Sequence, residues 1–267
     1  MSGPLLLRTW RWQWLRFALL VAAAVAWGWL IFFFYSVFSP TIREFVQGNP
    51  LMEQFSQFGS GDFFTVAGSA TLGLQHPLAI AILAVLAVGS SATAIAGERQ
   101  RGTLEVLLAR PLSRRTAYGT ILVALLVLVG LLVAAFLLGQ AIGLFVHELT
   151  DEVEVAALPL VWLNGFLLWA AFTTFGLAVS VTFDRPGPAI GLSLAYLLAN
   201  YFLEILGSLW TDAEWTQEYS LIHHFQPGEI LSGNADPFDI AILAVAAALP
   251  VIYALIVFPR RDLPAPS

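Results

Sequence analysis

The sequence predicts an all-α integral membrane protein with six transmembrane helices, an N-terminal amphipathic helix, and a short cytoplasmic helix between the second and third spans. Three observations carry this prediction. The 267 residues are 58% hydrophobic and only 11% charged, with a mean hydropathy of +0.80, whereas soluble domains carry about 25% charged residues. Six apolar runs reach the length of about 20 residues that a helix needs to cross a bilayer. The arginines gather in alternate connections between these runs.

Residues 1–16 form a basic and aromatic lead-in to the first apolar run. Arginines opposite tryptophans on a helical wheel are typical of a helix that lies in the headgroup layer. The same residues also fit the basic flank and aromatic belt of the first span, and the sequence leaves both interpretations open. The wheel places Leu6, Leu7, Trp10, Trp14 and Phe17 on one side and Arg8, Arg11 and Arg16 on the other.

The predicted spans follow one another along a single domain, residues 1–267. Proline marks several span ends, because it fits the first turn of a helix and breaks a helix from within. Pro40 and Pro259 are expected to end two spans, and Pro250 to kink the last one. Starts are marked by Pro77, Pro159, Pro188 and Pro237. The spans are 17–38, 78–96, 117–146, 160–183, 189–209 and 240–258.

Two connections on the predicted outer side are long. Residues 41–75 are too rich in aromatic side chains for a free loop, and Met52, Phe55 and Phe58 have the spacing of a short helix on the outer surface. Residues 210–237 contain five acidic residues and no arginine. This composition predicts an acidic and solvated outer face.

The arginines predict the orientation. Of the 12, all but Arg43 fall on the side of the N-terminus when the spans alternate. Cytoplasmic connections carry the excess of basic residues, so both termini and the connection at 97–116 are predicted to be cytoplasmic. The expected location is the cytoplasmic (inner) membrane of a prokaryote, as a multi-pass protein surrounded by lipid.

The composition excludes several kinds of chemistry. The chain has no cysteine and no lysine, so it can build neither a thiolate site nor the Walker A loop that binds nucleotide phosphates. Its four histidines form no metal-ligand pattern, and it has no Gly-x-Ser-x-Gly elbow. We therefore expect no catalytic residue, no metal site, no cofactor bound by this chain and no nucleic acid partner.

One acidic residue lies within the predicted spans. Glu204 is in the fifth span, about one turn after Asn200 and Tyr201. Charge at the centre of a bilayer costs about 2.5 kcal/mol or more, which makes such a residue a functional candidate. The polar face of this helix is expected to point inward. Either the three side chains line a substrate pathway, or Glu204 is paired or exposed; Gln140 and Asn164 are weaker candidates.

The densest charged stretch, residues 97–116, separates the second and third spans. Gly102-Thr103 indicates a break before a short helix over 104–109, which Pro111 ends, and Ser113 can cap the next helix. A helix parallel to the membrane and tethered to two spans would move both when a partner pushes on it. A plain basic loop is the alternative.

This segment resembles the coupling-helix motif of ABC-2 type transporter permeases. The resemblance extends to the lead-in, the six spans, the long external segment before the sixth span, and the Arg-Asp ending at 261–262. The aromatic connection at 41–75 departs from the family pattern, as does the missing lysine shortly after the motif. The matching residues are Glu98-x-x-x-Gly102-Thr103-Leu104-Glu105-x-Leu107-Leu108-x-x-Pro111-Leu112-Ser113-Arg114.

The resemblance implies a permease subunit of an ABC exporter. Two copies of the chain would pair with two copies of a separate ATPase subunit, which would bind ATP and Mg²⁺. The second and fifth helices would line a route between the copies, and the fifth would bring Asn200, Tyr201 and Glu204 towards it. The residues expected to contact the ATPase are Glu98, Arg99, Gly102, Thr103, Leu104, Glu105, Leu108 and Pro111.

Two other functions stay open. A membrane scaffold or mechanotransmitter would use the same ATPase without moving cargo through the bilayer, and an intramembrane enzyme would bind no ATPase. A continuous polar path where two copies meet would separate a transporter from a scaffold. A mostly apolar route would favour lipids or amphiphilic drugs over hydrated ions as cargo.

Overall fold

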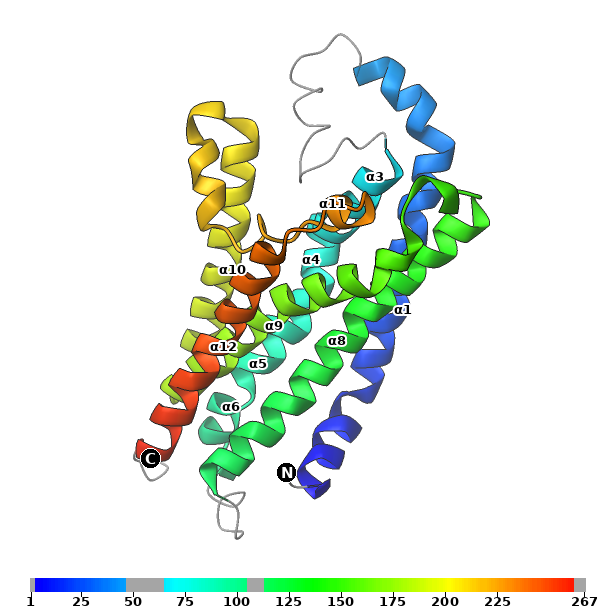
Figure 1. Cartoon of the computed structure of the whole chain (residues 1–267). Helices are drawn as coiled ribbons and strands as arrows, with labels where there is room; N and C mark the ends of the chain where they lie inside the picture. Colours follow the sequence, from blue (N-terminus) through cyan, green and yellow to red (C-terminus); the bar gives the residue numbers. More distant parts are fainter. Residues whose placement is uncertain (1–2, 47–64, 105–112, 262–267) are drawn as a thin grey trace.

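A computed structural model describes residues 3–46, 65–104 and 113–261, with side chains from residue 14 to 38 in the first of these ranges. Every regular element in these ranges is a helix (Figure 1). Within the described ranges, five helices are long and apolar enough to cross a membrane, and one bent pair is a sixth candidate span. The predicted all-α membrane class is confirmed, whereas the count of six requires that the bent pair be one span. Both termini lie at one end of the molecule (Figure 1), here named the termini end.

The first span belongs to one helix, α1, Gly3–Val46, of 44 residues. At 1.5 Å per residue it is about 66 Å long, roughly twice the hydrocarbon thickness of a bilayer. The lead-in is therefore continuous with the span and is not a separate helix. The expectation that Pro40 ends the helix is also wrong. Proline removes a single backbone hydrogen bond, and a helix can continue past that loss with a kink.

The second candidate span is bent by 44°. His76 lies at the bend, where its Nδ1 accepts a hydrogen bond from the Leu78 N–H at 3.2 Å. The sequence prediction placed residues 66–75 in an outer connection, but they form a largely buried helix whose many small side chains allow close packing against α1. The elements are α3 (Val66–Gln75), α4 (Pro77–Ala84), the π-helical turn η1 (Val85–Ser90), α5 (Ser91–Thr93) and α6 (Ala96–Gln100).

The other four spans lie close to their predicted ranges. Ser113 caps the third, as predicted, and its Oγ accepts a hydrogen bond from the Thr116 N–H at 3.1 Å. The spans are α8 (Arg114–Val146), α9 (Leu158–Thr182), α10 (Pro186–Leu209) and α12 (Pro237–Arg260). Short 3₁₀ turns, η2 (Thr150–Glu152) and η3 (Val155–Ala157), join α8 to α9.

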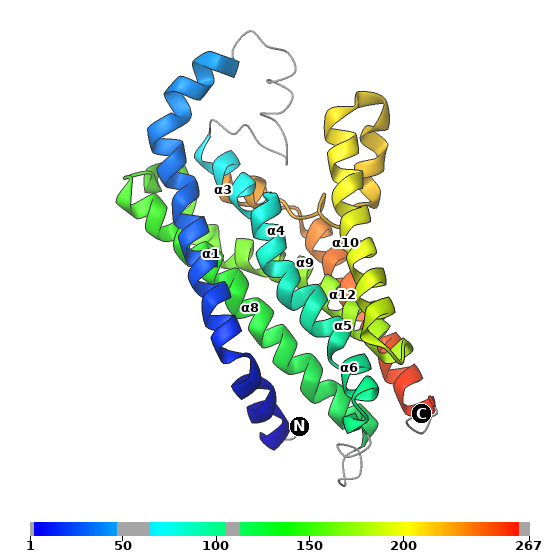
Figure 2. The same ribbon diagram turned by 180° about the vertical axis from the view of Figure 1, so that it is seen from behind.

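Helix α9 lies in the middle of the bundle, between α8 and the pair α10 and α12, with α5 on a further side (Figures 1 and 2). Its side chains Leu168, Trp169 and Phe172 are at most 2% exposed and belong to the main apolar core. Leu177 belongs to a second core nearer the termini end. A shift of α9 would therefore disturb the packing of both cores.

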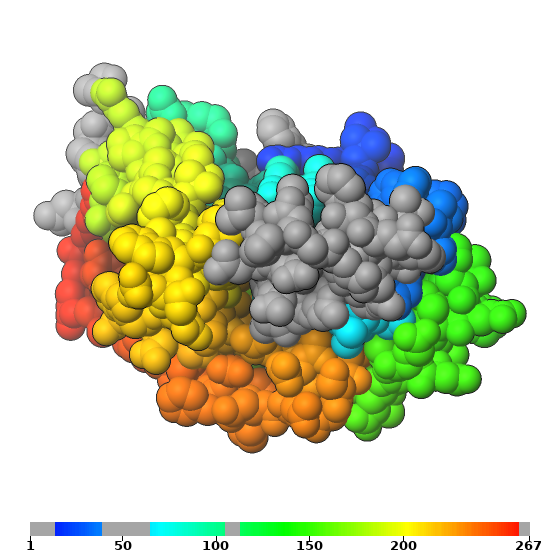
Figure 3. All heavy atoms as spheres, turned by 90° about the horizontal axis from the view of Figure 1, so that it is seen from above, coloured from blue at the N-terminus to red at the C-terminus, as the bar shows by residue number. Residues whose placement is uncertain are grey.

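Residues 210–236, here named the connector, fold back onto the bundle. Its 3₁₀ helix η4 (Thr211–Tyr219) returns along α10, where the Thr216 hydroxyl donates to the Leu203 carbonyl at 3.1 Å. Its helix α11 (Pro227–Leu231) lies beside α3 (Figures 1 and 2). Seen from this connector end, the yellow and orange residues lie next to each other along one side of the molecule (Figure 3). The connector is thus a packed part of the fold, and its five acidic residues are exposed on the surface, as the predicted acidic and solvated outer face requires.

Helices α1 and α8 approach closely because both carry glycine at their crossing. A Cβ on Gly139 would lie 2.2 Å from the Val25 carbonyl oxygen, and one on Gly28 would lie 2.4 Å from that of Phe136. Small residues allow such approach in a membrane, where van der Waals packing holds helices together. The membrane-spanning part of α1 is therefore seated on α8.

We expect Gly139→Ala to lower the stability of the protein by about 1–3 kcal/mol, because the added methyl group forces two backbones apart. Gly119→Ala on the same helix is the matched control, since nothing lies within 4 Å of its Cβ position. The control should be neutral or slightly stabilising, because alanine favours helix. Thermal unfolding in detergent checks this, and equal melting temperatures for the two variants would contradict the proposed close contact.

Candidate functional site

The described parts of the charged segment, in α6 and at the start of α8, lie at the termini end (Figure 2). The structure describes five of the eight residues predicted to contact a partner. The described five are Glu98, Arg99, Gly102, Thr103 and Leu104, and the other three are Glu105, Leu108 and Pro111. These three, with most of the predicted helix over 104–109, lie outside the described residues.

Glu98 and Gly102 shape a tight turn after α6. The Glu98 carboxylate accepts hydrogen bonds from the Arg101 guanidinium at 2.8 Å and from the Thr103 hydroxyl at 2.5 Å. Gly102 has a φ of +68°, a left-handed conformation that costs other residues about 1–2 kcal/mol. Its N–H donates to the Arg99 carbonyl at 2.9 Å. The predicted break at Gly102-Thr103 is present, and the glycine backbone makes it possible.

The Arg99 side chain points into the bundle and is only 6% exposed. Its Nη1 donates to the carbonyls of Val181 and Phe183 at 2.9 and 3.3 Å, and lies 3.4 Å from the Asp184 carboxylate. Its guanidinium carbon lies 6.0 Å from the centre of the Phe258 ring. The last carbonyls of a helix have no partner within it, so Arg99 completes the hydrogen bonding at the end of α9.

Two further arginines join this arrangement. Arg114, the first residue of α8, donates to the Phe258 carbonyl near the end of α12 at 3.3 Å. Arg261 donates to the Val181 carbonyl at 2.5 Å and pairs with the Asp184 carboxylate at 2.8 Å. The name arginine cluster is used below for Arg99, Arg114, Asp184 and Arg261.

The arginine cluster holds three positive groups against one carboxylate. Burial, followed by the positive charge of Arg261, lowers the pKa of Arg99 to about 10, although Asp184 opposes the shift. Arg99 therefore keeps its charge at neutral pH. The carbonyl ends of α9 and α12 supply further negative potential, because a helix C-terminus carries the negative end of the backbone dipoles.

The cluster ties both ends of the charged segment to the later spans. Arg99, near the start of the segment, binds α9, whereas Arg114, near its end, binds α12. The described residues at both ends of the segment are therefore bonded to spans that follow much later in the sequence. Sequence reasoning placed Arg114 in the motif and Arg261 in the Arg-Asp ending but gave neither a role, and it did not select Asp184. The only signal of Asp184 is its position just beyond an apolar run, which ordinary loop residues share.

A second tie lies one turn deeper. The Ser180 hydroxyl oxygen of α9 accepts hydrogen bonds from the N–H groups of Ile95 and Ala96 at 3.0 and 2.9 Å. These N–H groups stand where the chain passes from α5 to α6 and helical bonding is interrupted. The broken second span is therefore attached to α9 at the start of α6, through Ile95 and Ala96, and within α6, through Arg99.

Asn200 and Glu204 point inward, as predicted for the polar face of the fifth span, and each is 4% exposed. The Asn200 Oδ1 accepts from the Leu221 N–H at 2.7 Å, and the Glu204 Oε1 accepts from the Gln217 amide at 3.0 Å. Both side chains thus hold the connector on α10. Tyr201 is half-buried and packs against the main apolar core. A role of these residues in a substrate pathway stays a prediction.

Other buried amides serve the backbone in the same way. The Gln140 amide donates to the Ala70 carbonyl of α3 at 2.8 Å. Asn164 donates to the His224 carbonyl at 3.0 Å and accepts from the Gln226 N–H at 3.1 Å. Asn164 thus serves backbone that leaves regular helix, which needs such partners at membrane depth, whereas Gln140 joins α8 to α3. Gln140 and Asn164 therefore have structural roles in this arrangement.

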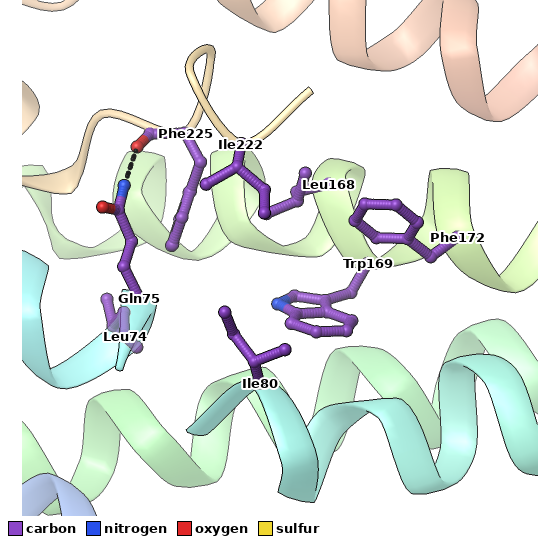
Figure 4. A pocket seen from close by; sticks show the side chains of 8 residues that line it. All are labelled: Leu74, Gln75, Ile80, Leu168, Trp169, Phe172, Ile222 and Phe225. Atoms are coloured by element: carbon purple, nitrogen blue, oxygen red, sulfur yellow. Dashed lines mark hydrogen bonds between the residues drawn. The ribbon is translucent and has the colours of Figure 1, made fainter. Parts of the chain in front are cut away.

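A small pocket lies at the bend between α3 and α4 (Figure 4). Apolar side chains from α4, α9 and the connector line it, among them Ile80, Trp169 and Ile222. At its edge the Gln75 amide donates to the Phe225 carbonyl at 2.8 Å. The pocket measures about 10 Å³, room for about one water molecule. It is too small to pass an organic cargo.

The two adjacent histidines of the connector turn to different helices. His223 faces Glu204 of α10, and His224 contacts Asp239 of α12. Within the parts of the chain that the structure describes, no three His, Cys, Asp or Glu side chains meet closely enough to hold a metal ion.

The chain matches a family model described as ABC-2 family transporter protein over residues 8–263. This range includes the charged segment, the arginine cluster and every candidate span. No curated protein and no solved structure matches the chain.

We expect Arg99→Met to lower stability by about 2–3 kcal/mol, because buried carbonyls of α9 lose a charged hydrogen-bond donor. Arg101→Met is the matched control, since the Arg101 side chain is 62% exposed and surface ion pairs contribute about 0–1 kcal/mol. Thermal unfolding of both variants in detergent measures the difference. If Arg99→Met and Arg101→Met have the same melting temperature, the cluster does not hold α6 to α9.

Proposed function

The chain belongs to the ABC-2 family of transporter proteins, and we propose that it is the permease subunit of an ATP-binding cassette exporter. A separate ATPase subunit would bind ATP and Mg²⁺ and hydrolyse the nucleotide. The observation that carries this proposal is the family match over residues 8–263. The ties between the charged segment and the later spans support it, because a permease needs a path for force from the ATPase.

In this proposal the charged segment, residues 97–116, is the coupling element. The Arg99 side chain is 6% exposed and Leu104 is 3% exposed. These two buried residues would transmit a movement of the ATPase into the bundle. Glu105, Leu108 and Pro111 would meet the ATPase directly. Closure of the ATPase would push the segment, and the arginine cluster would carry that displacement to α9 and α12. Both termini would then be cytoplasmic, in the inner membrane of a prokaryote.

The cargo route would lie between two copies of the chain, beside α10 and the broken second span. The outward face of α10 is apolar, with Leu194, Leu198 and Phe202 exposed by 41, 53 and 61%. A route along this face would accept lipids or amphiphilic molecules rather than hydrated ions. Asn200 and Glu204 would reach it only if the connector moved away from α10.

One observation favours the scaffold as a second candidate. The polar side chains Gln140, Asn164 and Asn200 are all engaged by backbone groups of the same chain, and the pocket at the α3–α4 bend measures about 10 Å³. An ATPase-coupled mechanotransmitter would need no passage. It would use the same coupling segment and act on another protein.

We expect Glu105→Arg to weaken co-purification with the ATPase about tenfold or more, because a reversed charge at an interface costs more than about 1.4 kcal/mol. The ATPase to test is one with a GxxxxGK[ST] loop encoded beside this chain. Glu214→Arg, the same charge change on the exposed face of η4, is the matched control and should bind normally. Equal binding by both variants would contradict the coupling role.

Transport is tested on the wild-type complex in vesicles of phospholipid with a fluorescent lipid analogue. ATP-dependent movement of the analogue between leaflets supports the exporter. ATPase activity that depends on the chain without movement of lipid analogues or amphiphilic dyes supports the scaffold. A chain that purifies alone and stimulates no ATPase contradicts both.

A further inference from the structure

His223 and His224 stand where the connector passes between α10 and α12. The His223 Nδ1 lies 3.8 Å from the Glu204 Oε2, and the His224 Nδ1 lies 2.7 Å from the Asp239 Oδ1. Consecutive side chains of the connector thus reach carboxylates on two different spans. Histidine is the side chain whose charge changes most readily near neutral pH, so the charge state of this dipeptide bears on how the connector is held.

The Glu204 carboxylate is incompletely satisfied. Its Oε1 accepts a hydrogen bond from the Gln217 amide at 3.0 Å, but its Oε2 is buried and has no hydrogen-bond partner. At 3.8 Å, His223 is beyond hydrogen-bond distance and within reach of charge attraction. A buried oxygen without a partner is costly, and a protonated His223 is the group placed to offset that cost.

We propose that His223 and Glu204 form a proton-sensitive latch that holds the connector on α10 when His223 is protonated and loosens it when His223 is neutral. Release would uncover Asn200 and Glu204, the two buried polar side chains of α10 that the connector covers. The latch rests on contacts within one chain. The further idea that the latch gates a cargo route at the connector end rests on the proposed function.

The direction of the pH effect follows from the charges around His223. Glu204 of α10 raises the pKa of His223 above its ordinary 6.5, partial burial opposes this, and Asp239 of α12 and Glu218 of η4 raise it further. A raised pKa in the folded state means that the latch contributes fully below pH 6.5 and loses its contribution as the pH rises through the raised value. The His223 side chain is 37% exposed, so solvent screens part of the effect.

The absence of cysteine allows spin labels to be placed at two chosen sites on the full chain. Trp215→Cys on η4 and Phe145→Cys at the end of α8 are 63 and 78% exposed in the wild type. Electron–electron distance measurements in lipid nanodiscs at about pH 5.5 and about pH 8 bracket the ordinary histidine pKa. We expect the population with a displaced connector to rise several-fold at the higher pH.

Two variants test the assignment. Glu204→Gln keeps the shape of the side chain and can still accept from Gln217, so it removes the charge with little change in packing, and His223→Gln removes the titrating group. Both should lose the pH response. His147→Gln is the matched control, because His147 lies at the connector end and faces the Phe33 ring rather than a carboxylate; it should respond as the wild type does.

A wild type whose distances do not change with pH would overturn the latch, as would a pH response that persists in both Glu204→Gln and His223→Gln. The measurement needs no ATPase and no cargo. Its failure would therefore leave the permease proposal standing, and the failure of ATPase binding would leave the latch standing.

Discussion

Backbone N–H and C=O groups that leave regular helix inside an apolar bundle must find partners within the protein, and this requirement organises the molecule. Water cannot satisfy them at membrane depth, and each unsatisfied group costs several kcal/mol. At the termini end, Arg99 and Arg261 satisfy the carbonyls that end α9. At the connector end, Asn164 and Asn200 satisfy the irregular backbone around residues 221–226.

These partners also decide which parts of the chain move together. The arginine cluster joins α6, α8, α9 and α12 through hydrogen bonds from its arginines. Helix α9 contributes side chains to both apolar cores, so the cluster at its end is joined to the packing of the whole bundle. The connector end differs from the termini end, because in the proposed latch the attachment of the connector to α10 depends on the protonation of His223.

The two faces of α10 carry opposite chemistry. Its polar side chains are turned under the connector, and its outward leucines and Phe202 are exposed. The polar residues of the spans therefore have a structural role, because they form hydrogen bonds with the backbone of neighbouring elements. A passage that used them would require the connector to move, which links the proposed latch to the proposed transport.

The sequence by itself determined the membrane class, the positions of α8, α9, α10 and α12, the cap at Ser113 and the break at Gly102. It could do so because a long apolar run has one well-bonded form in a bilayer, and because caps and left-handed glycines are local. Only the tertiary structure decided that residues 66–75 are a buried helix, that the connector is packed, and that Arg99 serves α9. Arg99 lies 82 residues before the Val181 carbonyl that it binds. A side chain's hydrogen-bonding capacity is encoded in its own residue, but its partner depends on which distant helix end the fold brings beside it.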